Sequence, residues 1–232
     1  MKLRLHGPRP WRGLTLVELL IGMAVGLFIV AASASLMTGN LREHRNLLIE
    51  SRLMQDLRTA ADIVTRDLRR AGYWGAANAG VRGNGVDAVL ANPYVELSPV
   101  GAAADSVSFR FSRDATENNA VDSNEQFGFR LRNGALELQL GSGNWQSLTD
   151  ANTLTVTLFS VTPTVEEISL AGLCETACPA TGSAASTCPP RQQVRSLAVV
   201  IAGHATQDAR LTRSIRTQVR LRNDRLIGAC PA

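Results

Sequence analysis

The chain has 232 residues, which is enough for one medium-sized domain with an appendage and for a buried core. Its composition, with 45% hydrophobic and 19% charged residues, excludes a low-complexity or disordered chain. The formal net charge is +4, but Lys2, Arg4, Arg9 and Arg12 precede the first acid, and the remaining 20 cations balance 20 acids. The overall charge therefore predicts no specific nucleic-acid partner, although a local basic face stays open.

A long apolar run follows this basic start. Residues 19–37 are 19 residues without a charge, which as a helix span about 28 Å and can cross a hydrocarbon core. The preceding cations predict a single-pass segment with a cytoplasmic N-terminus. Two alternatives are a plain signal anchor and a secretory signal cleaved after Ala34, which would release a soluble periplasmic protein.

Glu18 lies at the start of this run and lacks an obvious counter-charge. A charged side chain in a membrane helix costs about 2.5–3.5 kcal/mol at the helix centre and less near the interface. No cation follows Glu18 within one helical turn. A cut after Gly13 would give Leu14 a positively charged amine, which could lie near Glu18 of the same chain or of a neighbour. Proteolysis would therefore create the partner that the intact sequence lacks.

The residues from 13 to 21, GLTLVELLI, resemble the prepilin signature that type IV pilins share with type II secretion pseudopilins. The resemblance implies that a prepilin peptidase cuts between Gly13 and Leu14 and methylates the Leu14 amine. It also implies that Thr15 and Glu18 act in assembly, with Glu18 helping subunits to dock into a filament. Residues 1–13 would then be a cytoplasmic leader, and residues 14–38 a helix that stays in the inner membrane until assembly.

Gly22 and Gly26 form a G-x-x-x-G pair on one face of the expected membrane helix. Small residues at this spacing let helices approach closely in lipid. Helix packing and the ordinary abundance of glycine in membrane helices are both open explanations.

From residue 39 to residue 72 the pattern becomes amphipathic and extends the same helix. Apolar residues recur at three- and four-residue steps, which places them on one face. These residues are Leu47, Leu53, Leu57, Ala61, Val64, Leu68 and Ala71. The helix is expected to end after Ala71, with Gly72 as its cap, and its apolar face predicts a sheet that covers it.

The segment RDLRRAGYWG, residues 66–75, resembles the end of the long helix in PilW-type minor pilins of type IV pili. The match rests on Arg69, Ala71, Gly72, Tyr73, Trp74 and Gly75. A cysteine often follows in that family, whereas this chain has Ala76. The resemblance implies a position at or near the pilus tip. From the residues themselves, we expect Tyr73 and Trp74 to be buried under the helix end.

Residues 73–232 are expected to form a β-rich periplasmic domain. Alternating patterns predict strands at residues 106–112, 153–161, 194–202 and 214–222. Asn133-Gly134 is a favoured hairpin turn between two alternating runs in residues 127–140. One long helix followed by strands predicts an α+β, pilin-like fold with an antiparallel sheet packed on the helix.

Two loops hold the remaining candidate sites. Residues 114–126 are acidic and rich in asparagine, so calcium is conceivable, but the spacing is not that of an EF-hand and a solvated loop is preferred. The disulfide candidates are Cys174, Cys178, Cys188 and Cys230. Their even number beyond a membrane segment predicts two disulfides, with three pairings open. Zinc is a weaker alternative, since no histidine lies nearby in the sequence.

No catalytic, cofactor or metal signature is present, and His6, His44 and His204 are isolated from any nucleophile motif. We therefore predict a minor pilin that assembles or primes a type IV pilus, not an enzyme. Its expected partners are the prepilin peptidase, the major pilin, other minor pilins and the inner-membrane assembly platform. It would finally reach the pilus at the cell surface. The alternative with the same N-terminus is a type II secretion pseudopilin that acts in protein export.

Overall fold

A computed structural model describes residue 13 and residues 15–80, 90–180 and 187–231. These residues contain one α-helix, α1 (Leu16–Leu68), nine β-strands and three short 3₁₀ helices. The 3₁₀ helices are η1 (Ala77–Gly80), η2 (Ser123–Glu125) and η3 (Ala171–Leu173). The chain divides into two compact units, Met1–Ile49 and Glu50–Ala232.

Helix α1 confirms the single long helix that the apolar and amphipathic patterns predicted. It is the one helix among the described residues that is long and apolar enough to cross a membrane. It ends at Leu68, slightly before the predicted end, and the Ala71 N–H then bonds the Leu68 carbonyl in a tighter turn. Gly72 has φ +75°, as expected of a C-terminal cap, and its N–H donates to the Arg110 carbonyl at 2.8 Å.

The part of α1 within Glu50–Ala232 carries the predicted apolar face. Its buried apolar side chains are those of Leu53, Leu57, Ala60, Ala61, Val64 and Leu68, and none of them is more than 2% exposed. Leu47, expected on the same face, is 57% exposed and belongs to the other unit. The covered face therefore begins one to two turns later than the sequence pattern predicted.

Two antiparallel sheets form in place of the single sheet that we expected. The first has five strands in chain order: β1 (Leu97–Ser98), β2 (Ser106–Arg110), β3 (Gln126–Arg132), β4 (Ala135–Leu140) and β5 (Trp145–Ser147). The predicted hairpin at Asn133-Gly134 joins β3 to β4, and both turn residues have positive φ, at 51° and 75°. The inner face carries stacked phenylalanines, and the rings of Phe111 and Phe127 have centroids 3.9 Å apart.

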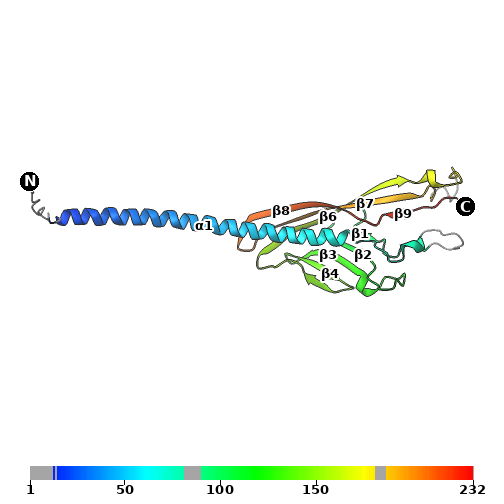
Figure 1. The fold of residues 1–232 in the computed structure, drawn as a ribbon, viewed down its shortest axis with the longest axis horizontal. Helices are drawn as coiled ribbons and strands as arrows, with labels where there is room; N and C mark the ends of the chain where they lie inside the picture. Colours follow the sequence, from blue (N-terminus) through cyan, green and yellow to red (C-terminus); the bar gives the residue numbers. More distant parts are fainter. Residues whose placement is uncertain (1–12, 14, 81–89, 181–186, 232) are drawn as a thin grey trace, which may run out of the picture. The chain divides into compact units, whose positions relative to one another are not determined.

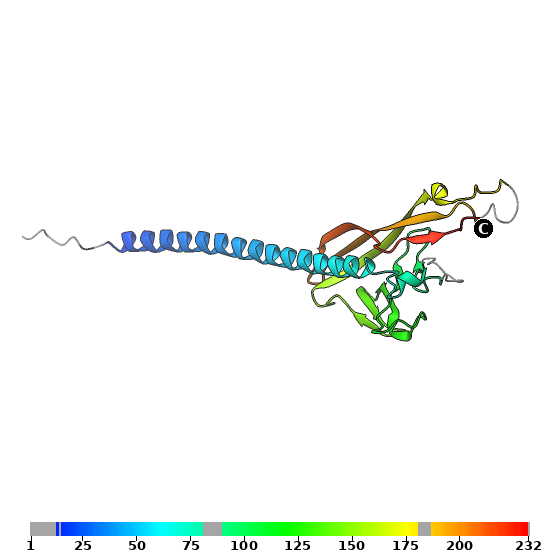
Figure 2. The same ribbon diagram turned by 45° about the vertical axis from the view of Figure 1, so that its right-hand side comes forward.

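The second sheet comprises β6 (Leu154–Ser169), β7 (Arg191–Ala205), β8 (Asp208–Arg220) and β9 (Arg225–Ile227). Strand β7 is central: it pairs with β6 on one side and with both β8 and β9 on the other. An isolated bridge between Ala104 and Val161 links the two sheets. In Figures 1 and 2 the two sheets lie on different sides of the cyan end of α1.

Strands β6 and β7 are longer than their apolar patterns indicated. Most of the residues added at the far end of this hairpin are polar, and Glu167 of β6 accepts hydrogen bonds from Arg191 and Gln193 of β7 at 3.0 and 2.7 Å. Polar pairs across the strands thus extend the hairpin beyond its apolar core, where alternation of hydrophobic residues gives no signal.

Polar contacts fasten α1 to the second sheet and to the turn before it. The Arg213 guanidinium of β8 forms an ion pair with Glu50. The Thr153 hydroxyl, next to β6, donates to Asp56 Oδ2 at 2.7 Å. Glu50 and Asp56 are close in sequence to the buried Leu53 and Leu57, so the two polar contacts lie near the start of the covered face of the helix.

Candidate functional site

The start of α1 contains a reciprocal hydrogen-bond arrangement between Thr15 and Glu18. The Thr15 backbone N–H and hydroxyl donate to Glu18 Oε2 at 3.2 and 3.0 Å, and the Glu18 N–H donates to Thr15 Oγ1 at 3.2 Å. This is a capping box, which satisfies N–H groups that a helix start leaves without partners. Sequence reasoning missed this local role of Glu18, although Thr-x-x-Glu spacing is its known signal.

The capping box holds a carboxylate next to the predicted cleavage point. Glu18 Oε2 accepts from the backbone of Thr15, which is two residues beyond Gly13. Gly13 is exposed, and a Cβ built on it would meet nothing within 4 Å. Leu14 and the basic leader, residues 1–12, lie outside the described residues. A negative charge at this position also suits the positive end of the helix dipole.

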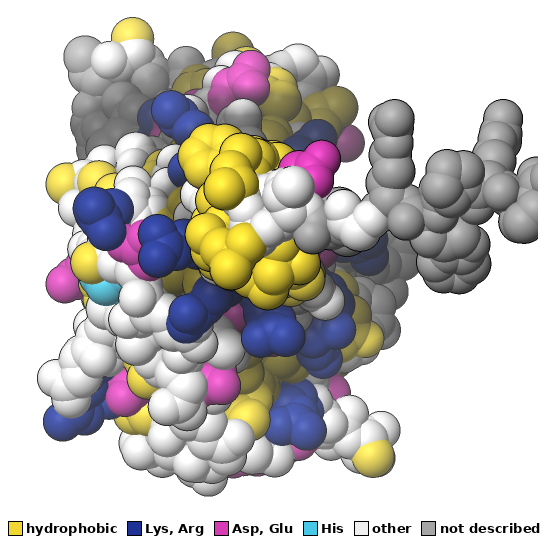
Figure 3. Space-filling model, turned by 90° about the vertical axis from the view of Figure 1, so that its left-hand side faces the viewer, with side chains coloured by type: hydrophobic (Ala, Val, Ile, Leu, Met, Phe, Trp, Pro, Cys, Tyr) yellow, Lys and Arg dark blue, Asp and Glu magenta, His cyan; other side chains and the backbone are white. Residues whose placement is uncertain are grey.

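The apolar part of α1 has its side chains uncovered. Leu27 and Phe28, for example, are 71% and 75% exposed, and none of the most apolar stretch of the helix is buried. Figure 3 shows apolar side chains of this kind gathered at the front of the face it presents, in yellow. A Cβ on Gly22 or Gly26 would meet nothing within 4 Å, so both glycines leave room for a close neighbour. A surface of this extent requires lipid or other apolar helices around it.

The PilW-like segment at the end of α1 is partly buried. Trp74 is 6% exposed, and its indole N–H donates to Asn119 Oδ1 at 2.9 Å. Tyr73, which we expected to be buried as well, is 51% exposed. The helix ends in a turn at Gly72, and the two successive aromatic side chains then point to different environments, one inward and one outward.

A buried polar network lies in the acidic loop that the sequence suggested was solvated. Glu125 is fully buried, and its two carboxylate oxygens accept from the N–H groups of Arg113 and Asp122 at 2.8 and 2.9 Å. Tyr94 is also fully buried, and its hydroxyl lies 2.9 Å from Glu117 Oε1 and 2.8 Å from the Ala120 carbonyl. The loop is therefore held to the domain by carboxylates. Asp122 and Glu125 form a capping box at η2, which the Asp-x-x-Glu spacing could have signalled; the contact of Glu117 with Tyr94 has no such local signal.

The titration of these groups follows from their surroundings. Burial, together with the hydrogen bond to Glu117, raises the pKa of the Tyr94 phenol well above its ordinary value. Partial burial acts to raise the pKa of Glu117, but hydrogen bonds from Ser112, Tyr94 and two backbone N–H groups outweigh it and lower that pKa. Burial and the nearby Glu125 raise the pKa of Asp114.

The acidic loop also bears on the calcium alternative. Carboxylate oxygens of Asp114, Asp122 and Glu125 lie within 4.8 Å of one another. In this structure both oxygens of Glu125 accept backbone hydrogen bonds from Arg113 and Asp122, so this carboxylate holds the two ends of the loop together.

The four cysteines form two disulfides. Cys174 bonds Cys230, and Cys178 bonds Cys188. The first bond ties residues near the end of β6 to residues beyond β9, and the second closes a short loop. The pairing could not be chosen from the sequence, since all three pairings were compatible with it.

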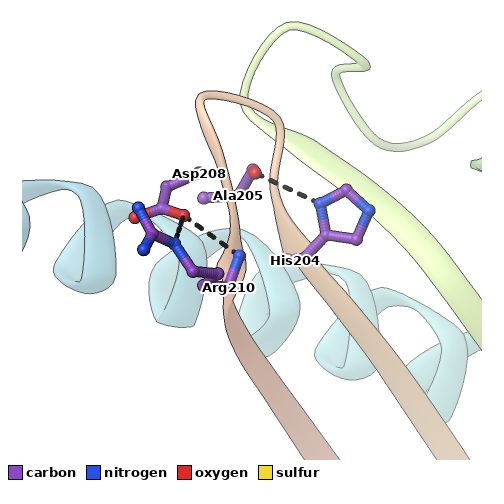
Figure 4. Close-up of polar contacts among 4 residues, drawn as sticks. All are labelled: His204, Ala205, Asp208 and Arg210. Atoms are coloured by element: carbon purple, nitrogen blue, oxygen red, sulfur yellow. Dashed lines mark hydrogen bonds and ion pairs between the residues drawn. The ribbon is translucent and has the colours of Figure 1, made fainter.

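His204 lies at the turn between β7 and β8. Its Nδ1 lies 3.2 Å from the Ala205 carbonyl oxygen, and Asp208 accepts from the Arg210 backbone and guanidinium, as Figure 4 shows. These contacts are local to the turn.

A comparison with known protein families gives a match for this chain. The model of the family described as prepilin peptidase-dependent protein B matches residues 46–221 of the 232-residue chain, which is well over half. This match begins after the apolar run, so it is independent of the signature at residues 13–21. No curated protein and no solved structure matches the chain. The long apolar helix with its capping box, the β-rich domain and the family match agree, and the chain belongs to the family of prepilin peptidase-dependent protein B.

Proposed function

We propose that this chain is a minor pilin of a type IV pilus, cut after Gly13 by the prepilin peptidase and methylated at Leu14. The observation that carries the proposal is the Thr15–Glu18 capping box, which starts an uncovered apolar helix in a member of a prepilin peptidase-dependent family. The PilW-like segment at residues 66–75 supports a role in priming assembly at or near the pilus tip.

The proposed assembly step is electrostatic. Cleavage leaves a positive amine on Leu14, one residue before the Thr15 N–H that already contacts the Glu18 carboxylate. In lipid, where charges are poorly solvated, that carboxylate is a strong partner for the amine of the same or a neighbouring subunit. The major pilin, other minor pilins and the assembly platform would supply the neighbours, with Gly22 and Gly26 permitting close helix contacts.

The proposed location follows from the helix. The basic leader keeps the N-terminus cytoplasmic, α1 anchors the chain in the inner membrane, and the disulfide-bonded domain lies in the periplasm before export to the pilus.

The decisive test separates the charge of Glu18 from its capping role. Glu18→Gln keeps a side-chain oxygen that can cap the helix but removes the negative charge. We expect normal cleavage and at least a tenfold loss of incorporation into sheared pili, measured by quantitative mass spectrometry. Glu43→Gln, an exposed carboxylate of α1 without a described partner, is the matched control and should incorporate normally.

Two further readouts bear on the proposal. The mature N-terminus should be N-methyl-leucine at Leu14, and Gly13→Val should leave the chain at precursor size. A native chain beginning at Met1 or Ser35 would contradict the processing, and normal incorporation of Glu18→Gln would contradict the docking role. Loss of protein secretion with intact twitching in a deletion strain would instead assign the chain to type II secretion.

A further inference from the structure

Four arginine side chains line one pocket at the C-terminal end of α1, within Glu50–Ala232. The pocket has a volume of about 430 Å³, which is in the range of small-molecule sites. Its lining residues are Arg66, Arg69, Arg70, Arg222, Tyr73, Ser112 and Asn223. The first three arginines belong to the helix end and Arg222 to the connection between β8 and β9, so the fold brings together cations that are far apart in sequence.

The positive charge of this arginine pocket is poorly compensated. No aspartate or glutamate belongs to its lining among the described residues. Arg66 contacts Asp67 at 3.5 Å, and the Arg70 guanidinium lies 4.1 Å from the centre of the Phe111 ring. The side chains of Arg69 and Arg222 have no hydrogen bond or ion pair with any described residue. Since like charges in one site disfavour each other, an anion would lower the energy of this arrangement.

Hydrogen bonds of the Arg222 backbone and of Asn223 hold the β8–β9 connection against the end of α1. The Arg222 N–H donates to the Arg69 carbonyl at 3.4 Å, and Asn223 Nδ2 donates to the Ala71 carbonyl at 3.0 Å. The carbonyl of Asn223 in turn accepts from the buried Arg195 guanidinium at 3.0 Å. The β8–β9 connection is thus pinned to the helix end, and Arg222 is held beside Arg69 by the backbone.

The helix dipole accounts for only part of the cluster. Cations in the last turn suit the negative end of a helix, which explains Arg66, Arg69 and Arg70. It does not explain why Arg222, from a different element, lines the same pocket. Arginine guanidinium groups are the donors that best recognise anionic oxygens.

We propose that the arginine pocket binds a phosphate group. The lining carries four positive charges and no negative one, so a doubly charged anion matches it better than a single carboxylate does. A phosphate also presents several acceptor oxygens in a tetrahedral arrangement, which donors converging from two elements can reach together. The site is independent of the cleavage and docking at residues 13–18.

The test measures binding of inorganic phosphate to the full chain in zwitterionic detergent micelles, by isothermal titration calorimetry at constant ionic strength. We expect Arg69→Gln and Arg222→Gln each to weaken binding about tenfold, the effect of losing one charge-assisted hydrogen bond. Arg216→Gln removes the same charge from an exposed residue of β8 that has no described partner, and it should change binding less than twofold. All three variants should melt within about 2 °C of the parent in the absence of phosphate, because they alter exposed side chains.

Further probes test the charge of the bound phosphate group. Stronger binding of thymidine monophosphate than of dimethyl phosphate would support the proposal, because only the phosphomonoester carries two negative charges. Equal binding of the singly charged dimethyl phosphate would count against the proposal. It is overturned if millimolar phosphate does not bind, if acetate binds as tightly as phosphate, or if Arg216→Gln weakens binding as much as Arg222→Gln does.

Discussion

Replacing Tyr94 by phenylalanine tests whether the buried network under the acidic loop stabilises the domain. The ring stays, and only the hydroxyl that contacts Glu117 and the Ala120 carbonyl is lost. A hydrogen bond to a charged group contributes about 1.5–3 kcal/mol, so we expect a loss of about 2 kcal/mol. For a domain of this size each kcal/mol changes the melting temperature by about 2–4 °C, which gives a decrease of about 4–8 °C.

Tyr73→Phe is the matched control. This tyrosine is 51% exposed, and its hydroxyl has no hydrogen bond with the residues that the structure describes. The same chemical change should therefore alter the free energy of unfolding by less than about 0.5 kcal/mol. Both variants are compared with the parent chain by thermal unfolding in detergent micelles, followed by near-ultraviolet circular dichroism. Equal melting temperatures for Tyr94→Phe and the parent, or equal decreases in both variants, would refute the assigned role of the network.

Three other predictions concern the domain. The lowered pKa of Glu117 means that its ionised form stabilises the fold. The parent should therefore be more stable than Glu117→Gln, with the full difference above pH ~4.3 and a smaller difference as the pH falls further. A difference in denaturant unfolding that does not change with pH would contradict this. Since burial raises the pKa of Asp114, Asp114→Asn should raise the melting temperature at pH 7, and a lower melting temperature would count against this reasoning. Removing the Cys174–Cys230 disulfide, with a sequence separation of 56, should lower the free energy of unfolding more than removing Cys178–Cys188, with a separation of 10. The chain-entropy estimates of these losses are about 4 and about 3 kcal/mol. Denaturant unfolding of the two double-serine variants measures both losses, and the opposite order would show that loop length does not dominate.

The features that the sequence predicted well are those with a local physical cause. The helix follows from apolar residues at three- and four-residue steps, and Leu57 and Val64 are fully buried as this pattern required. The hairpin follows from Asn133-Gly134, because both residues tolerate positive φ. The predicted strands all exist, with errors confined to their ends.

The features that the sequence did not predict depend on contacts between distant segments. Alternation shows that a stretch is a strand but not which strand it pairs with, so the division into two sheets was missed. The burial of Tyr94 requires Glu117 and the Ala120 carbonyl, which lie 23 and 26 residues away in the sequence. Tyr73 is exposed because the chain turns at Gly72, and a composition-based expectation of aromatic burial cannot anticipate that direction.

The candidate site divides along the same line. The Thr15–Glu18 capping box is local and could have been recognised from the Thr-x-x-Glu spacing alone. The arginine pocket could not, since Arg222 and Arg69 are brought together by a backbone hydrogen bond across more than half of the chain. Leu14 is not among the described residues, so the proximity of its amine to Glu18 stays a prediction.

The fastening of α1 to late strands has a consequence for biogenesis. Glu50 meets Arg213 across a sequence separation of 163, and Ala71 meets Asn223 across 152. If the domain is exported as proposed, these contacts cannot form until β8 and the residues that follow it have also crossed the membrane. Contacts between segments so far apart in the sequence slow folding, and they leave apolar surface exposed in folding intermediates, which promotes aggregation. For the proposed periplasmic location, we expect a periplasmic chaperone to bind the chain until its last strands are present.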